Sequence, residues 1–183
     1  VIAPAHHRRI QAGILSWGQD LDHEHNPFQC NLGYQVSLSG KGEWEKKADY
    51  IGKDALEKMK AELADGKKPY KLQLVGFELG GKPIDEYAPD FWLVSPEDGG
   101  DPCGFITSPW FHPEKGKNIA MGYIPFDGTL NANGFPKWEL GKKFKVHLPD
   151  IYADSPGEPV DAVTVEVPFT ESHNANTREV VKG

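Results

Sequence analysis

The residues best suited to chemistry lie close together, between positions 13 and 36. Within residues 16–20 (SWGQD), Gly18 is the one residue that adopts a positive φ freely, so a sharp turn is predicted there. We expect the neighbouring side chains of Trp17, Gln19 and Asp20 to project from the rim of that turn. A polar loop of this kind is typical of a ligand-binding wall, and it is equally compatible with an ordinary surface connection.

Carboxylates and imidazoles follow at once, in the run from residue 20 to residue 25. Such groups bind divalent ions, but the pair His23 and His25 in an extended segment supplies at most two ligands on one side. The tandem pair His6 and His7 is no better placed, because adjacent side chains on a helix point about 100° apart. We therefore predict packed or surface histidines and no metal site.

Several common catalytic and binding classes are excluded by what the sequence lacks. It has no G-x-S-x-G elbow, no Walker A motif and no G-x-G-x-x-G between a strand and a helix. The net charge of -7, from 20 Lys and Arg against 27 Asp and Glu, argues against a nucleic-acid partner, which would require clustered basic residues. The sequence therefore favours a small-molecule ligand over nucleic acid.

The composition also bears on the membrane and on the cellular compartment. No apolar run approaches the about 20 residues that span a bilayer, so no membrane partner is predicted. Cys30 and Cys103 are far apart in sequence and match neither a C-x-x-C motif nor a disulfide framework. We therefore expect a reducing compartment, the cytoplasm.

The elements that must position these residues begin with a short helix over the first 13 residues. Ile10 and Ile14 are four residues apart and would share its apolar face, and Gly13 would end it. Residues 28–38 are predicted to form a half-buried strand, because apolar residues recur at every second position from Leu32 to Leu38.

The clearest helix is predicted over residues 54–64. Leu56, Met59 and Leu63 form one apolar stripe, and Gly66 follows as a stop signal. Such a stripe faces a core and indicates nothing about function.

After Pro69 the pattern changes to strands and turns. Apolar residues alternate through 72–79, with a change of phase at Val75 and Gly76 that predicts a β-bulge. Turn sequences then recur at spacings typical of an all-β barrel or sandwich. The further strand candidates are residues 91–95, 104–107, 118–124, 143–148 and 162–167.

An ordered series of motifs resembles the C-terminal half of the folate-dependent aminomethyltransferase family, which includes the glycine cleavage T-protein and tetrahydrofolate-dependent demethylases. The details SWGQD, NPFQ and residues 113–118 look closer to dimethylsulfoniopropionate demethylases and related O-demethylases than to T-protein. The motifs are residues 9–20 (RIQAGILSWGQD), 26–29 with 32–33 (NPFQ and LG), 49–56 (DYIGKDAL), 74–77 (LVGF), 104–108 (GFITS), 118–123 (NIAMGY) and 167–169 (VPF).

The resemblance implies an α+β fold. Residues 1–69 would be the C-terminal part of a folate-binding central α/β region with a linker helix, and residues 70–169 a distorted antiparallel β-barrel. Residues 170–183 would be a polar tail. In the full protein three domains would form a ring around a folate channel.

The implied function is transfer of a methyl group (demethylase type) or an aminomethyl group from a small donor to tetrahydrofolate. The partners would be the N-terminal half of the same protein and a small methylated donor. Because the family's pteridine-binding acidic residues lie in that half, we expect this chain to be a fragment, or one product of a split or cleaved protein, and to be inactive alone. A non-catalytic folate-binding or assembly factor of the same fold is the alternative.

The resemblance also suggests which residues contact the cofactor, while the catalytic groups are expected in the missing half. Arg9 matches the arginine of the family's R-[LI]-E-x-G motif, although Gln11 stands where the family usually has Glu. A guanidinium can hold a folate carboxylate with two hydrogen bonds. The other candidate cofactor contacts are Trp17, Gln19, Asp20 and Tyr34, of which Trp17 and Tyr34 could instead be core aromatics.

From the sequence we expect Arg9, in the full assembly, to approach the anionic tail of folate and not to pair with an acidic neighbour such as Asp20 or Asp22. Under that expectation, Arg9→Ala would weaken tetrahydrofolate binding and leave the thermal stability nearly unchanged.

Overall fold

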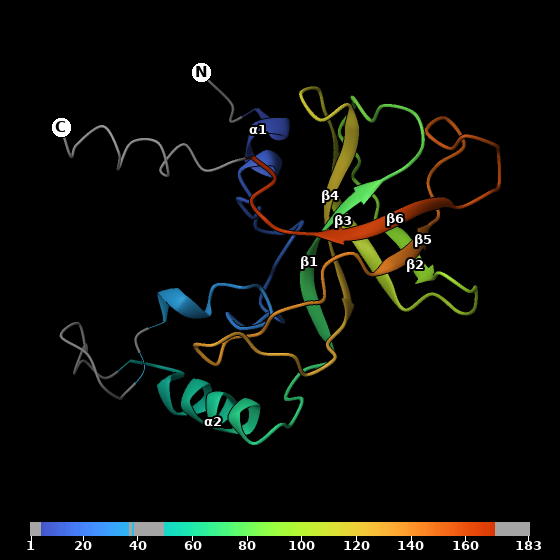
Figure 1. Cartoon of the computed structure of the whole chain (residues 1–183). Coiled ribbons are helices and arrows are strands. Elements are labelled where there is room, and N and C mark those ends of the chain that lie inside the picture. The colour runs from blue at the N-terminus through green and yellow to red at the C-terminus, as the bar shows by residue number, and fades with distance from the viewer. Residues whose placement is uncertain (1–4, 37, 39–49, 171–183) are drawn as a thin grey trace, which may run out of the picture.

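Six antiparallel strands close into a barrel in the computed structural model of the chain, which describes residues 5–36, 38 and 50–170 (Figure 1). Around the barrel the strand order is β1-β4-β3-β2-β5-β6. The predicted antiparallel barrel in an α+β chain is confirmed, and each predicted strand after residue 70 is present. The ends differ by at most two residues, except that the strand predicted at 104–107 continues to His112. The strands are β1 Leu72–Leu79, β2 Trp92–Pro96, β3 Gly104–His112, β4 Lys117–Pro125, β5 Lys143–Val146 and β6 Val160–Val165.

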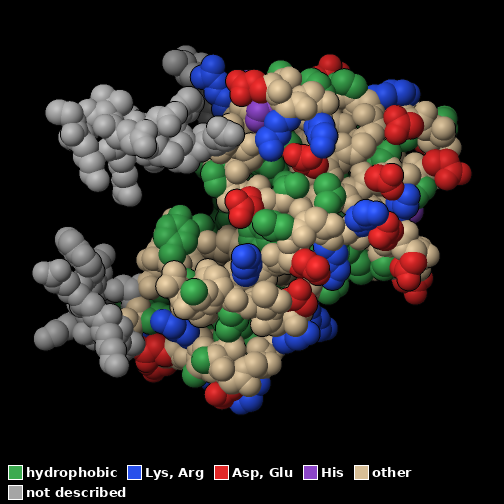
Figure 2. Space-filling view, viewed as in Figure 1, with side chains coloured by type: hydrophobic (Ala, Val, Ile, Leu, Met, Phe, Trp, Pro, Cys, Tyr) green, Lys and Arg blue, Asp and Glu red, His purple; other side chains and the backbone are tan. Residues whose placement is uncertain are grey.

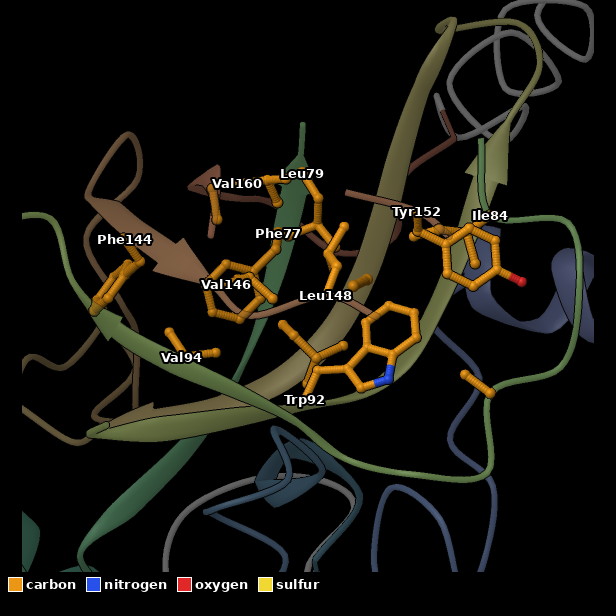
Figure 3. Packing of buried hydrophobic residues seen from close by; sticks show 14 of the residues in the cluster. Phe77, Leu79, Ile84, Trp92, Val94, Phe144, Val146, Leu148, Tyr152 and Val160 are labelled. Carbon is orange, nitrogen blue, oxygen red and sulfur yellow. The ribbon is translucent and has the colours of Figure 1, made fainter. Parts of the chain in front are cut away.

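The barrel interior is filled by alternate residues of the strands, as the period of two in a strand requires (Figure 3). Val75, Phe77 and Leu79 of β1 all point inward and are buried. The ring of Phe77 meets that of Phe144 edge to face, with centroids 6.0 Å apart. This packing makes the interior a solid apolar core.

Strand β4 is buried on both faces. Its outward side chains Ile119, Met121 and Tyr123 have no exposed surface, because an N-terminal helix and the segment that follows it cover them. That helix, α1 (His6–Gln11), contributes Ile10 and packs against β3 and β4. Burial on both faces explains why β4 is almost continuously apolar in sequence.

The second helix, α2 (Lys53–Ala64), agrees closely with the predicted span. Leu63 is buried, while Leu56 and Met59 are partly buried against the same small core, so the predicted stripe is confirmed. That core also contains Phe28 and Phe126, which attach α2 to the end of the barrel at which β4 finishes (Figure 1).

Residues 28–38 do not form the predicted strand. Within their described part a short 3-10 helix, η1 (Gly33–Gln35), is present instead, and residue 37 lies outside the described residues. Side-chain bonds to β1 fix this course, since the Asn31 amide donates to the Leu74 carbonyl at 2.8 Å and the Gln73 amide donates to the Gln29 carbonyl at 3.1 Å. Polar bonding to a distant strand therefore overrides the apolar alternation.

Two smaller predictions are also wrong. Strand β1 pairs with β4 without interruption, and the irregularity lies in β3, between Ile106 and Ser108. Gly76 is instead a point of close approach, where a Cβ would lie 2.5 Å from Cγ2 of Val167. Ile14 is 59% exposed because α1 ends before it, so it does not share a helix face with Ile10.

None of the described helices has the length and apolar character needed to cross a membrane. Cys30 and Cys103 are both free thiols.

The close contact between β3 and β4 predicts that a single methyl group added at Gly104 destabilises the protein. A Cβ on Gly104 would lie 2.1 Å from the carbonyl oxygen of Tyr123, so Gly104→Ala should lower the free energy of unfolding by about 1–3 kcal/mol. Gly80→Ala is the matched control, because a Cβ there meets nothing nearer than 3.5 Å, and it should change stability by less than about 0.5 kcal/mol. Urea unfolding of both variants measures the difference, and equal stabilities would contradict the packing described.

Candidate functional site

The turn predicted at Gly18 is present, with φ of +83° at that residue. The backbone N–H of Asp20 donates to the carbonyl of Ser16 at 2.8 Å and closes the turn. The side chains do not all project from its rim, however. Trp17 does and is 62% exposed, whereas Gln19 and Asp20 point inward and are buried.

The Asp20 carboxylate is completely buried and receives four hydrogen bonds. Its Oδ1 accepts from the hydroxyl groups of Thr107 and Ser108, at 2.6 and 2.5 Å. Its Oδ2 accepts from the backbone N–H of Ser16 at 2.8 Å and from Nη1 of Arg9 at 2.7 Å. A charge can be buried only when its hydrogen bonds are satisfied in this way.

Arg9 is the counter-charge, and the expectation that it would not pair with Asp20 is wrong. Its side chain is 9% exposed, and its Nη1 also donates to the carbonyl of Ile14 at 3.1 Å. Its Nη2 donates to Oε1 of Gln19 at 3.2 Å and to the hydroxyl of Ser108 at 2.8 Å. The guanidinium is therefore held by protein acceptors on two nitrogens, in a buried position.

The third nitrogen of this guanidinium is also occupied. Nε of Arg9 donates to Nδ1 of His6 at 3.3 Å. Partial burial and the neighbouring Arg9 charge lower the pKa of His6, which favours the neutral ring that can accept this bond.

Gln19 extends the same network to the barrel. Its amide Nε2 donates to the carbonyl of Thr107 at 2.8 Å and to that of Ala88 at 3.2 Å. The five residues joined by these bonds form what we call the Arg9–Asp20 network, which connects α1, the Gly18 turn and β3. Its members are Arg9, Gln19, Asp20, Thr107 and Ser108.

Tyr34 lies apart from this network and is 71% exposed on η1. Neither Tyr34 nor Trp17 is a core aromatic, so that alternative is wrong for both. Tyr34 lines a cavity of about 460 Å³, together with aromatic side chains that include Phe28, Phe135 and Trp138. Figure 2 shows apolar side chains beside the recess between the α1 and α2 parts of the molecule.

The sequence did not indicate the far wall of this cavity. Asn131, Lys137, Trp138 and Glu166 line it, yet they lie about a hundred or more positions after Tyr34. No motif links them to Tyr34, because the cavity forms only when the 126–140 loop folds back beside η1. A second, smaller cavity of about 190 Å³ continues along Tyr34 and Trp138 to the Gly13 turn.

The histidines near the turn make local contacts. The ring of His23 packs edge-on against Trp17, with centroids 4.9 Å apart, and Nδ1 of His25 lies 2.7 Å from Oδ1 of Asp22. In the described parts of the chain, no three His, Cys, Asp or Glu side chains are grouped as metal ligands would be.

No protein-family model matches the chain. Curated proteins named aminomethyltransferase do: that of Thermosynechococcus vestitus is 30% identical over 162 residues, which is 88% of this chain and 35% of the relative. That of Halothermothrix orenii is 33% identical over 119 residues, 65% of this chain and 28% of the relative. The chain belongs to the aminomethyltransferase family. It matches a C-terminal portion, about a third of the length of these relatives.

The solved structure of glycine cleavage system aminomethyltransferase T from Bartonella henselae has the same fold in this region. The TM-score is 0.61 at 22% identity, over 89% of this chain and 37% of that one. The curated relatives confirm the sequence-based resemblance at the level of the family, and this solved structure confirms the barrel fold.

The burial of the ion pair predicts that Arg9 is essential for stability. Arg9→Ala would leave the Asp20 carboxylate buried without its counter-charge, so the free energy of unfolding should fall by about 3–5 kcal/mol. This replaces the expectation of unchanged stability. The neighbouring Arg8 is exposed, and Arg8→Ala should stay within about 0.5 kcal/mol of the parent protein. Chemical denaturation of the pair gives the comparison, and an Arg9 variant as stable as the Arg8 variant would show that the network contributes little.

Proposed function

We propose that this chain is the C-terminal portion of a tetrahydrofolate-dependent one-carbon transferase. The observation that supports this most directly is the alignment of 88% of the chain with a protein named aminomethyltransferase. The group transferred would be an aminomethyl or a methyl group from a small donor. The names of the relatives favour the aminomethyl group, and the SWGQD and NPFQ details favour a demethylase.

Transfer to a folate nitrogen depends mainly on the alignment of donor and acceptor, and a rigid support for each is what a protein can supply. The Arg9–Asp20 network provides such a support, since it fixes the Gly18 turn to β3 through buried bonds. We propose that Arg9, Gln19 and Asp20 act by positioning the turn that carries Trp17. Direct contact between Arg9 and folate would require its protein hydrogen bonds to break.

Tyr34 is the described residue best placed to meet the cofactor itself. Its exposed ring borders a cavity with an aromatic wall, and flat aromatic rings pack favourably against such side chains. The cavity, at about 460 Å³, lies within the range of about 300–1,000 Å³ for small-molecule sites. We propose that a ring of tetrahydrofolate stacks on Tyr34 in the full protein.

The proposal is tested by the product that the full protein forms. The protein that includes the family's upstream region should convert tetrahydrofolate to methylene-tetrahydrofolate with an aminomethyl donor, or to methyl-tetrahydrofolate with a methyl donor. Mass spectrometry of the folate product distinguishes the two, and a reaction without donor is the control. The 183-residue chain alone should give neither product. Folate binding without turnover by the full protein would support the non-catalytic alternative, and absence of binding would contradict both.

A separate test addresses Tyr34. Tyr34→Ala in the full protein should weaken tetrahydrofolate binding by about 1–3 kcal/mol, the range for an aromatic side chain stacked on a base. Tyr34→Phe retains the ring and should bind nearly as well as the parent protein. Because Tyr34 is mostly exposed, neither change should alter stability by more than about 0.5 kcal/mol. Calorimetric titration measures the affinities. Equal tetrahydrofolate affinities of the two variants would show that Tyr34 does not contact the cofactor.

A further inference from the structure

The side chain of Tyr34 is exposed, yet the backbone just before it is held in a strained conformation. Among the described residues other than glycine, only Asn31 has a positive φ, at +61°. This conformation is costly for most side chains, and asparagine is one of the few that tolerate it. Strain of this kind persists only where the surrounding structure holds it in place, and it is common at ligand sites.

Both ends of the Asn31 side-chain amide bond to strand β1. Its Nδ2 donates to the carbonyl of Leu74 at 2.8 Å, and its Oδ1 accepts from Nε2 of Gln73 at 2.5 Å. Gln73 is itself fixed, because it is 1% exposed and its Oε1 accepts from the hydroxyl of Tyr70 at 3.0 Å. Burial raises the pKa of Tyr70, so this hydroxyl keeps the proton that it donates. We call the bonds of Asn31 to Gln73 and Leu74 the Asn31 clamp.

The residues before Asn31 are attached to β1 by other bonds. The carbonyl of Gln29 accepts from the backbone N–H of Leu74 at 3.0 Å and from Nε2 of Gln73 at 3.1 Å. These bonds hold the neighbouring Phe28, which is fully buried in the core beside α2. The Asn31 clamp is therefore additional, and it acts on the residues that follow, which form η1.

The 3-10 helix η1 is also held along one face by close packing. A Cβ on Gly33 would lie 2.8 Å from a ring carbon of Phe28 and 2.9 Å from one of Phe135. These two rings stack with centroids 6.4 Å apart, and both line the cavity of about 460 Å³ that Tyr34 borders. The backbone at Tyr34 is thus fixed from before by the clamp and from one side by the wall of the cavity.

Asn31 and Tyr34 also share a position between two cavities. Both residues line the cavity of about 460 Å³ and the smaller one of about 190 Å³. An aromatic ring on an already ordered backbone loses less conformational entropy when a ligand binds to it. The clamp therefore favours binding at Tyr34 without any contact of its own to the ligand.

We propose that Asn31 is a positioning residue for the ligand of these cavities, because its clamp fixes η1 so that Tyr34 borders both cavities before the ligand binds. This inference rests on the proposed function, since it takes that ligand to be tetrahydrofolate.

Amide hydrogen exchange of the full protein without folate tests the first part of the inference. Asn31→Gly removes both bonds of the clamp and leaves the positive φ unstrained. The amides of Gln35 and Val36, whose hydrogen bonds form η1 and its end, should exchange several-fold faster in this variant. The amide of Phe126, which donates to the carbonyl of Lys71 at 2.9 Å, is the internal control and should exchange at the parent rate if the fold is kept.

Calorimetric titration of the full protein with tetrahydrofolate tests the second part. Asn31→Gly should weaken binding about fivefold, as expected if the competent conformation of η1 is then populated about a fifth of the time. In the Tyr34→Ala background the same change should weaken binding less than about twofold, because the two residues act as a unit. Ser95→Ala, which removes a hydrogen bond to His147 on another side of the barrel, is the matched control and should bind as the parent protein does.

Unchanged exchange at η1 in Asn31→Gly would overturn the inference, and so would faster exchange with unchanged affinity. An affinity loss of equal size in both backgrounds would also overturn it, because Asn31 would then act independently of Tyr34. If the parent protein bound no tetrahydrofolate, the proposed function would be lost and the role of Asn31 in folate binding with it. The exchange measurement would still decide whether the clamp fixes η1, so the two failures are distinguishable.

Discussion

A single buried ion pair determines how the N-terminal segment lies on the barrel. Arg9 and Asp20 approach to 2.7 Å in a position that water does not reach. Removing a charge from water costs several kcal/mol for each ion. The attraction between the two charges offsets this cost only when their other polar atoms are also hydrogen-bonded. Here the carboxylate has four donors, and the guanidinium donates from all three nitrogens. The geometry of the turn is therefore tightly specified.

The outer face of β4 depends on that arrangement. Tyr123 and Met121 are large apolar side chains that would face water if α1 and the Gly18 turn were displaced. The hydroxyl of Tyr123 donates to the backbone of Asp20, and burial raises its pKa far above the ordinary value, so it remains a donor. The polar network and the apolar cover are thus mutually dependent, since each holds the other in place.

This division of roles has a consequence for function. The polar residues that the family resemblance selected are buried and hydrogen-bonded to other parts of the protein. The aromatic residues Trp17 and Tyr34 are instead exposed and do not pack in the core. Under the proposed function, the buried network would supply rigidity, and the exposed rings would supply contact area for a flat cofactor.

The sequence alone determined the elements whose signals are local. Period-two alternation located β1, apolar runs bounded by turn sequences located the other five strands, an apolar stripe located α2, and a glycine among larger residues located the Gly18 turn. The ordered motifs also identified the family and the barrel before any coordinates. These features follow from properties of neighbouring residues, so neighbouring residues are sufficient to predict them.

Only the tertiary structure decided which way the side chains of the turn point and what they bind. Asp20 is inward because Thr107 and Ser108, about ninety positions later, present hydroxyl groups to it, and no local pattern encodes that meeting. The same reason explains the missing strand at 28–38, since its alternation is local but its bonds are made to β1. The cavity beside Tyr34 likewise requires the 126–140 loop, and contacts over such distances exist only once the chain has folded.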